Sequence, residues 1–461
     1  MEELAATAIE TGLNAGATFV DIRIEYTRKT SIEVVNGVTR TTILATEKGA
    51  GIRAFVDGSW AFGHTSDLTN SGIRQAAESI TKMALATRPW IYEKIEIDAP
   101  TFKDTIDYKT KVPVDTTPIE FKINLAKQIS SSISQFDKRV SNSKVIYRDA
   151  YTELYVANSL GTRIREDSAR MVFIPICTAK DIRSTQRGIA AMGFTGGLGD
   201  IGDERIQWMT EEPSRVALSL LSSKAIKGGV YDIIADPILN GAMIHEAFGH
   251  ACEGDSLTGG SSVLQDKMAT PVGPEHINLA DDPTLRGHIG SFVYDWEGTR
   301  AEKRVMVKDG ILSEFLHTID TASRLNMNVN GAARAASFMF PPIPRMSNTF
   351  MESGDWDLEE LIQDTKEGVI MCNVDYGYTD STKGQFMFKA EHGQLIEKGE
   401  RTTIVRDASI AGLILEILPK IDAVCNDFFY DSGTCGTQGQ EVWVMSGGPH
   451  IRIRQVPVGG V

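Results

Sequence analysis

The sequence contains few cysteines, and their spacing excludes a disulfide framework. Five of them are scattered along 461 residues, at Cys177, Cys252, Cys372, Cys425 and Cys435. Small secreted proteins that depend on disulfides show an even number of cysteines at short, regular spacings. The start of the chain, Met1-Glu2-Glu3-Leu4, also lacks the basic residues and apolar segment of a secretory signal. We therefore expect reduced thiols and a cytoplasmic location.

Long apolar runs and an excess of basic residues are absent as well. The most apolar stretch, residues 408–418, is shorter than the ~20 residues that cross a bilayer, and it contains Glu416. The formal charge of −14 gives an average surface that repels nucleic acid, and no basic patch opposes it. Membrane-spanning and nucleic-acid-binding functions are therefore not expected.

The chain is long and apolar enough to form more than one core. Of its 461 residues, 42% are hydrophobic, which is typical of two or three domains. The patterns predict an α+β fold, with mixed α/β N-terminal domains and a large, predominantly β C-terminal domain that opens with a strand and a helix. The predicted boundaries are 1–94 for an N-terminal α+β domain, 95–118 for a linker, 119–228 for a middle α/β domain and 229–461 for the C-terminal domain.

Within these units the patterns predict short strands and amphipathic helices. The expected strands are 19–26, 31–35, 39–46, 51–56, 144–149, 152–158 and 171–180. The expected helices are 1–15, 68–86, 119–136 and 205–224. Residues 253–290, rich in glycine, aspartate and proline, predict a long loop, and such loops are usually functional or mobile.

The run His245-Glu246-Ala247-Phe248-Gly249-His250 points to chemistry. It combines two imidazoles, which bind zinc, with a carboxylate. Zinc peptidases with the pattern H-E-x-x-H place their histidines four residues apart on one helical face, with the glutamate as general base. Here the two histidines are five residues apart. The run therefore predicts a zinc peptidase site on an altered helix.

A regular α-helix would not bring these histidines together. Residues five apart are offset by roughly 140° around the axis, compared with roughly 40° for residues four apart. Both can bind one ion only if the helix loosens, either as a π-bulge or by unwinding its last turn. Gly249 is expected to tolerate the distortion. The flanking sequence predicts a strand at 231–235, a helix start at Asp236-Pro237 and a helix stop at Glu253-Gly254-Asp255.

Two histidines leave zinc short of ligands, because catalytic zinc sites generally use three protein groups and one water molecule. Cys252 follows His250 closely and is expected to point away from it. Cys435 lies in a glycine-rich segment, 431–439, that can bring a thiolate near an ion. Spacing alone leaves further candidates open, namely His276, His288, His317, Glu253 and Asp255.

Several segments together resemble one protein family. The stretch from His245 to Asp255 is similar to the active-site motif of the TldD/PmbA metalloproteases, whose hallmark is H-E-x-x-x-H. Further similar segments occur in the expected order along nearly the whole chain, at 19–23, 36–37, 49–53, 295–299, 344–349 and 433–436. One departure occurs at Glu391-His392-Gly393-Gln394, where the family usually has an acidic residue before glycine or alanine and an aromatic residue. The acid is therefore displaced or replaced there.

The resemblance implies a zinc metalloprotease in which His245, His250 and Cys435 bind Zn²⁺ and Glu246 is the catalytic base. It also implies a dimer, formed by two copies of this chain or with a related subunit that lacks the motif, because this chain is similar to the motif-bearing, TldD-type subunit. Such a dimer would enclose the metal in a shared cavity that admits unfolded chains or small peptides.

The ligand types are compatible with this chemistry. Two neutral imidazoles and one thiolate leave a zinc site with a net charge of about +1, which polarises a bound water molecule and a peptide carbonyl. Glu246 would take the proton of that water and pass it to the leaving amine. Glu253 and Asp255 either orient a histidine through its second ring nitrogen or are charges of the loop.

Other functions stay open at this point. A chain that binds zinc structurally, or serves mainly as a partner-binding subunit with little hydrolysis, would not need Glu246 as a base. A metal-dependent amidohydrolase acting on small non-peptide amides would use the same groups. A peptide substrate would bind by adding a strand to a sheet edge, for which 385–388 and 441–445 are candidates, although ordinary internal pairing is the more common arrangement for such strands.

Overall fold

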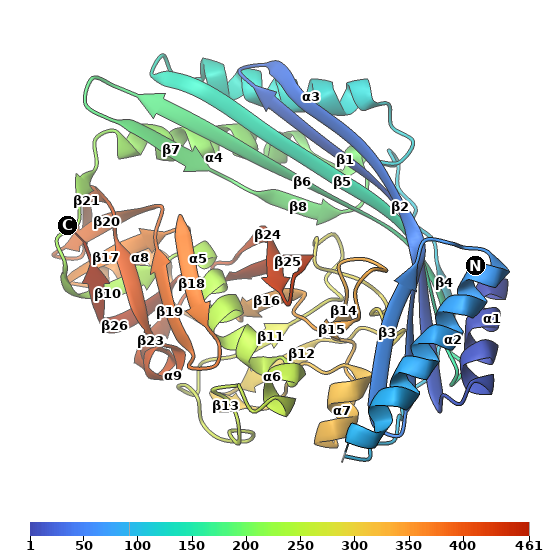
Figure 1. Cartoon of the computed structure of the whole chain (residues 1–461). Coiled ribbons are helices and arrows are strands. Elements are labelled where there is room, and N and C mark those ends of the chain that lie inside the picture. Colours follow the sequence, from blue (N-terminus) through green and yellow to red (C-terminus); the bar gives the residue numbers. More distant parts are fainter. Residues whose placement is uncertain (92, 461) are drawn as a thin grey trace.

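A computed structural model describes residues 1–91 and 93–460 of the chain. Tyr92 in the first predicted domain and Val461 at the end of the third lie outside the described residues. The α+β prediction is confirmed. Figure 1 shows a long curved sheet, formed by the N-terminal half, that arches over a body of further sheets and short helices.

The curved sheet has eight strands in the order β3-β2-β1-β5-β6-β4, with β7 and β8 also paired to β6. Their bounds are β1 Phe19–Val35, β2 Val38–Val56, β3 Ser59–Thr65, β4 Lys103–Ile106, β5 Val140–Asn158, β6 Arg163–Lys180, β7 Thr185–Ile189 and β8 Met192–Thr195. Strands from the first and middle predicted domains thus lie in one sheet, and β4 lies within the predicted linker. The domain boundaries stay a prediction.

The prediction of short strands is wrong, because each of the pairs predicted within β1, β2 and β5 is one long strand. Polar residues between the apolar runs suggested breaks at these points. In the structure these polar residues have partners within the protein. Thr27 lies 3.0 Å from Thr152 on the neighbouring strand. Lys122 donates to Thr30 at 3.2 Å and to Asp149 at 2.6 Å. The strands therefore continue through these residues.

Four long helices cover the outer face of this sheet, near the predicted positions. Their bounds are α1 Glu2–Asn14, α2 Asn70–Thr87, α3 Ile119–Phe136 and α4 Asp203–Leu220. On β1, Ile22 packs under α1 and α2, and Ile32 packs under α3. Successive side chains of a strand point to opposite faces. The intervening residues of β1 therefore face the C-terminal half, where Glu25 accepts a hydrogen bond from the backbone of Phe338 at 2.6 Å.

The C-terminal half contains two larger sheets. A ten-stranded sheet has the order β18-β19-β22-β26-β10-β17-β20-β21-β9, with β23 paired to β26. Its strands are β9 Lys224–Ala225, β10 Gly229–Ala235, β17 Glu367–Cys372, β18 Tyr376–Asp380, β19 Gln385–Lys389, β20 His392–Glu397, β21 Glu400–Arg406, β22 Ser409–Leu413, β23 Ile421–Val424 and β26 Ile451–Gly459.

A six-stranded sheet has the order β13-β12-β11-β16-β25-β24, and β14 pairs separately with β15. These strands are β11 Leu279–Asp281, β12 Arg304–Lys308, β13 Ile311–Leu312, β14 Ala333–Arg334, β15 Ile343–Pro344, β16 Asn348–Met351, β24 Phe429–Thr437 and β25 Gln440–Gly448. The short helices of this half are α5 Pro237–Met243, α6 Gly254–Thr258, α7 Ile319–Leu325, α8 Leu358–Asp364 and α9 Ile414–Ile417.

The main core of the C-terminal half surrounds α5 and the segment that follows it. Met243, Ile244 and Phe248 are fully or almost fully buried there, together with side chains from both sheets. The sheets therefore pack against this helix from several sides. Within the described residues, no helix is both long and apolar enough to span a membrane.

Candidate metal centre

The helix that carries the two histidines changes type along its length. Asp236 caps α5 by accepting a hydrogen bond from the backbone of Leu239 at 2.8 Å. After α5, the chain forms a π-helix over Ile244–Gly249 and a 3₁₀ turn over His250–Cys252. The predicted loosening is thus confirmed as a π-helix. Because a π-helix brings residues five apart together, both imidazoles project to the same side.

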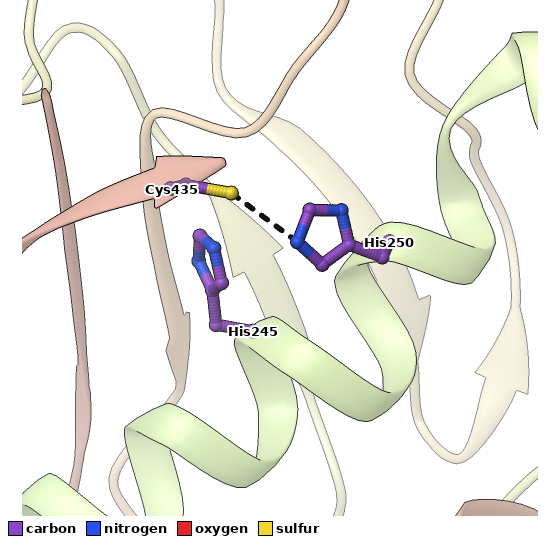
Figure 2. Close-up of side chains that lie close together, drawn as sticks. All are labelled: His245, His250 and Cys435. Atoms are coloured by element: carbon purple, nitrogen blue, oxygen red, sulfur yellow. Dashed lines mark hydrogen bonds between the residues drawn. The ribbon is translucent and has the colours of Figure 1, made fainter. Parts of the chain in front are cut away.

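His245, His250 and Cys435 converge, as Figure 2 shows. The sulfur of Cys435 lies 3.2 Å from Nε2 of His250. The two imidazole rings are 5.4 Å apart between centroids, with their planes at 85°. One potential ligand atom from each residue lies within 4.8 Å of the others. Zinc binds nitrogen at about 2.0–2.1 Å and sulfur at about 2.3 Å, so one ion fits between three atoms at such separations.

The hydrogen bonding of His245 also fits a metal ligand. This side chain is only 3% exposed, and neither ring nitrogen has a hydrogen-bond partner among the described residues. Burying a polar atom without a partner costs free energy, which coordination to a metal would offset. Two imidazoles and a thiolate are a donor set that suits zinc. The three residues therefore fit a zinc ion.

The charges in this group favour the thiolate form of Cys435. Burial alone would raise the pKa of the thiol, but the adjacent His245 and His250 lower that pKa to about 3. Burial would lower the pKa of both imidazoles, yet Cys435 raises the pKa of His245, and Glu253 raises that of His250 well above its usual value. The thiolate is the form of cysteine that binds metals.

Glu253 orients the His250 ring from the side opposite to Cys435. Its Oε2 lies 3.0 Å from Nδ1 of His250, the ring nitrogen that does not face Cys435. The other oxygen of Glu253 lies 3.6 Å from Nε of the buried Arg345. Arg345 also donates to the backbone carbonyl of Cys435 at 2.6 Å. Arg345 therefore ties the orienting carboxylate to the strand that carries the sulfur, a role that its sequence position did not reveal.

Asp255, the other acid considered for this role, accepts a hydrogen bond from Gln438 at 2.6 Å instead. We expect Glu253→Gln to lower zinc affinity about 10- to 100-fold, because it weakens the contact that fixes a ligand ring. Competition with a chromophoric chelator measures this affinity. Asp255→Asn is the matched control and should bind zinc like the unchanged protein. Equal affinities of the two variants would contradict the assignment of Glu253.

Glu246 lies beside the group and reaches solvent. Its side chain is 39% exposed, and its Oε2 lies 3.7 Å from Nε2 of His250. The same oxygen accepts a hydrogen bond from Thr379 at 3.2 Å. Thr379 belongs to β18, and no pattern in the sequence marked it. An exposed carboxylate next to the ligand atoms is placed to take a proton from a water molecule there.

A glycine is needed at position 249 because a larger side chain would not fit there, and not because the backbone takes an unusual conformation. Its φ of −61° and ψ of −45° are ordinary helical values, so the expectation that it tolerates an unusual backbone is wrong. A Cβ atom at this position would lie 2.1 Å from the sulfur of Met346. The buried Met346 therefore packs directly against the backbone of the helix between the two histidines.

This contact predicts the effect of a single methyl group. Gly249→Ala should lower the free energy of unfolding by about 1–3 kcal/mol, because it overpacks a filled core. Denaturant unfolding of the variant measures this change. The double variant with Met346→Ala should lose less free energy of unfolding than the two single variants lose together. Strict additivity would contradict the close contact.

The other ligand candidates lie outside the converging group. Cys252 is fully buried in the apolar core, consistent with its predicted orientation. The three candidate histidines bond elsewhere: His276 to the carbonyl of Ile421 at 3.1 Å, His288 to the carbonyl of Arg286 at 3.2 Å and His317 to Thr321 at 3.3 Å. Among the residues that the sequence spacing left as possible third ligands, the structure thus places Cys435 next to the two motif histidines.

The prediction that residues 385–388 and 441–445 form strands at a sheet edge is wrong. Residues 385–388 lie in β19, between β18 and β22, and residues 441–445 lie in β25, between β16 and β24. Both are internal strands. The outermost strands near the metal centre are their neighbours, β18 with Thr379 and β24 with Cys435.

The segment that departs from the family pattern has a structural role. Glu391 accepts hydrogen bonds from the backbone of Ile189 in the curved sheet at 2.9 Å and from Asn373 at 2.8 Å. Burial raises its pKa to about 7. His392 lies in β20, where burial lowers its pKa to about 4. Glu391 thus connects the two halves of the molecule, and neither residue belongs to the converging group.

Comparison with known proteins identifies close relatives of the whole chain. Sequence-family models of the PmbA/TldA metallopeptidases match three parts of the chain. Residues 20–84 match domain 1, residues 112–221 the central domain and residues 228–460 the C-terminal domain. A metalloprotease of Methanocaldococcus jannaschii is 35% identical, with 94% of this chain and 95% of the relative covered. A protein of Saccharolobus solfataricus named zinc metalloprotease TldD homolog is 28% identical, with 96% and 97% covered.

Solved structures share the fold. A crystal structure from Thermotoga maritima superposes with a TM-score of 0.82 at 21% identity and covers 99% of this chain and 100% of its own. The structure of TldE from Thermococcus kodakarensis superposes with a TM-score of 0.81 at 16% identity and covers the same shares. The arrangement of a curved sheet over a C-terminal body is thus common to these proteins.

Proposed function

The chain belongs to the PmbA/TldD metallopeptidase family, and from this premise we propose that it hydrolyses unfolded chains or small peptides at a zinc ion held by His245, His250 and Cys435. The observation that carries the proposal is the meeting of these three side chains on one side of the π-helix. Zinc is named for one relative and fits the donor set found in this chain. A cytoplasmic location stays a prediction.

When bound, zinc would supply a Lewis acid that polarises the peptide carbonyl and an attacking water molecule. Glu246 takes a proton from that water and passes it to the nitrogen of the leaving amine. Thr379, which donates to Glu246, holds the carboxylate toward the ligand atoms. Glu253 keeps the His250 ring turned so that Nε2 faces the ion.

The substrate is held by its main chain in this proposal. β18 and β24 are each the last strand of a sheet, and both contact the helix that carries the motif. An extended peptide that adds to such an edge gains backbone hydrogen bonds without regard to sequence. The exposed Tyr376 and Tyr378 on β18 offer apolar contacts to its side chains. This mode of binding requires an extended chain and therefore excludes folded proteins.

We extend the proposal to a dimer that encloses the centre, with a second copy of this chain or a related subunit lacking the motif. The tip of β2 supports it. Residues 38–48 pair with β1 on one side, whereas β3 pairs only with the later part of β2, from Ala50 onward. Val38, Ile43 and Leu44 are more than half exposed on this segment, at 53%, 53% and 67%. An apolar strand edge of this kind favours pairing with another chain.

Removal of the metal tests the proposed function. Unstructured casein and short peptides should be cleaved by the zinc-loaded protein, and a chelator should abolish cleavage, because zinc polarises the carbonyl in this proposal. Readdition of zinc should restore the rate. Turnover that persists in chelator would reject every metalloenzyme interpretation. Turnover of small amides without cleavage of peptides would instead favour an amidohydrolase.

A further inference from the structure

A cavity lies on the other side of the strand that carries Cys435. It has a volume of about 380 Å³ and lies between the inner face of the curved sheet and the C-terminal half. Cavities of about 300–1,000 Å³ commonly bind small ligands. Thr434, the neighbour of Cys435 on β24, lines this cavity. Because successive side chains of a strand point to opposite faces, β24 separates the cavity from the metal centre. We call it the arginine cavity.

Two arginines of this cavity are bonded only to neutral groups. Arg170 of β6 donates to the carbonyls of Ile289 at 3.1 Å and Ser291 at 2.9 Å, and to the hydroxyl of Ser168 at 3.2 Å. Arg334 of β14 donates to the carbonyls of Met346 at 2.6 Å and Trp443 at 2.7 Å. A guanidinium has five N–H donors, so donors of Arg334 are left over for a ligand.

Among the described residues, neither guanidinium forms an ion pair with a carboxylate. The nearest negative charges act only from a longer distance, Glu166 on Arg170 and both Asp281 and the Cys435 thiolate on Arg334. Arg334 is 5% exposed. Burial, reinforced by the nearby charges of Arg170 and Arg345, lowers the pKa of Arg334 to about 9. Buried charges in proteins are normally paired, and an anion in the cavity would supply the missing partner.

Within the described residues, none of the acidic side chains that line the cavity contacts Arg170 or Arg334. Glu25 accepts hydrogen bonds from Thr27 and from the backbone of Phe338. Asp149 is paired with Lys122 at 2.6 Å. Glu441 is exposed. Aromatic side chains complete the wall, namely Phe292, Trp296 and Trp443. The ring of Phe292 lies under the guanidinium of Arg334, at 5.5 Å from its centroid, and holds that group in place.

We propose that the arginine cavity binds a carboxylate group of a peptide through Arg170 and Arg334. Guanidinium groups match carboxylates in both charge and planar geometry. The assignment of a peptide as the ligand rests on the proposed peptidase function, whereas the anion site itself does not. The carboxylate is either the free C-terminus of the peptide or the side chain of an aspartate or glutamate. The bound carboxylate would lie one strand away from the metal centre. The arginine cavity therefore favours, among the peptides that reach the metal centre, those that carry a carboxylate at this distance.

The position of Arg334 links this site to the metal centre. Its guanidinium bonds the carbonyl of Met346, the residue that packs against Gly249 between the two histidines. Arg345, next to Met346, forms an ion pair with Glu253 and donates a hydrogen bond to the carbonyl of Cys435. Arg334 therefore connects the cavity to the same short segment that supports the ligands of the ion.

Calorimetric titration of the full-length Glu246→Gln variant tests the proposal without turnover. The three probes are acetyl-pentaalanine with a free C-terminus, the same peptide as its C-terminal amide, and acetyl-Ala-Ala-Glu-Ala-Ala-amide. At least one of the two anionic peptides should bind about tenfold more tightly than the neutral amide, because charge-assisted hydrogen bonds are the stronger ones. A preference for the free C-terminus assigns the α-carboxylate, and a preference for the glutamyl peptide assigns the side chain.

Variants of the two arginines identify the site. Arg170→Gln and Arg334→Gln should each remove most of this preference, and glutamine retains N–H donors for the carbonyls that the arginine held. Circular dichroism checks that each variant is folded, and Arg170→Gln remains informative if Arg334→Gln is not. Arg300→Gln, at an exposed arginine outside the cavity, is the matched control and should keep the preference.

Equal binding of all three peptides would overturn the proposal, as would a preference that survives both substitutions. The same titrations with the metal-free chain separate this proposal from the peptidase function. A chain that binds carboxylates as described but never cleaves casein would contradict only the proposed function. A chain that cleaves casein but binds all three probes equally would contradict only the arginine cavity.

Discussion

Glu246→Gln is expected to retain about one zinc per chain and to lose peptide cleavage by about 10²- to 10⁴-fold, the usual contribution of a positioned acid–base group. Glutamine has nearly the shape of glutamate and can still accept the hydrogen bond from Thr379, but it cannot take a proton. The three proposed ligands are untouched. Metal analysis of the purified variant and a fluorescent casein assay measure the two properties separately.

Glu352→Gln is the matched control for this substitution. Glu352 is an exposed acid that pairs with Lys303 at the surface of the C-terminal half, so its loss should leave both zinc content and cleavage unchanged. Cleavage at the full rate by Glu246→Gln would reject the assignment of the general base. Loss of zinc from that variant would instead make Glu246 part of the metal site.

Cys435→Ser is expected to lose the metal. The serine hydroxyl is not deprotonated at neutral pH, whereas the neighbouring histidines stabilise the Cys435 thiolate. Since removal of an outer-shell partner already lowers metal affinity about 10- to 100-fold, loss of a ligand should lower it by about 100-fold or more. Zinc content after dialysis and chelator competition measure this loss, and cleavage should disappear with it.

Cys372→Ser provides the control, because Cys372 is a half-buried free cysteine in β17 that lies outside the converging group. It should keep both zinc and activity. If Cys435→Ser retained one tightly bound zinc per chain, the third ligand would have to be a different residue. His317 and Asp255 would then be the next candidates to replace, since both lie close to the end of the motif helix.

The distortion of the motif helix could be predicted from the sequence, because it follows from local geometry. Two histidines five residues apart can share an ion only on a loosened helix, and the structure has a π-helix there. The reason for Gly249 could not be predicted, because it depends on Met346, which lies far along the chain. The long strands were missed for a similar reason. Thr30 accepts a hydrogen bond from Lys122 of α3, which also donates to Asp149 of β5, and both residues lie elsewhere in the sequence.

The completed site depends even more on contacts between distant segments. Spacing left the third ligand open, since Cys435 reaches His250 through the pairing of β24 with β25. Arg345 and Thr379 carry no local signal, because an arginine after proline and a threonine in a strand occur in many settings. Only the packing of the sheets around the helix shows that one supports Glu253 and the other contacts Glu246.

The convergence of three side chains on one ion is the central claim, and a crystal of the zinc-loaded protein tests it most directly. An anomalous-difference map recorded at the zinc absorption edge should show a single strong peak at about 2.0–2.1 Å from one nitrogen each of His245 and His250 and about 2.3 Å from the sulfur of Cys435. A peak bonded to other residues, or the absence of any peak in a protein that cleaves casein, would contradict it.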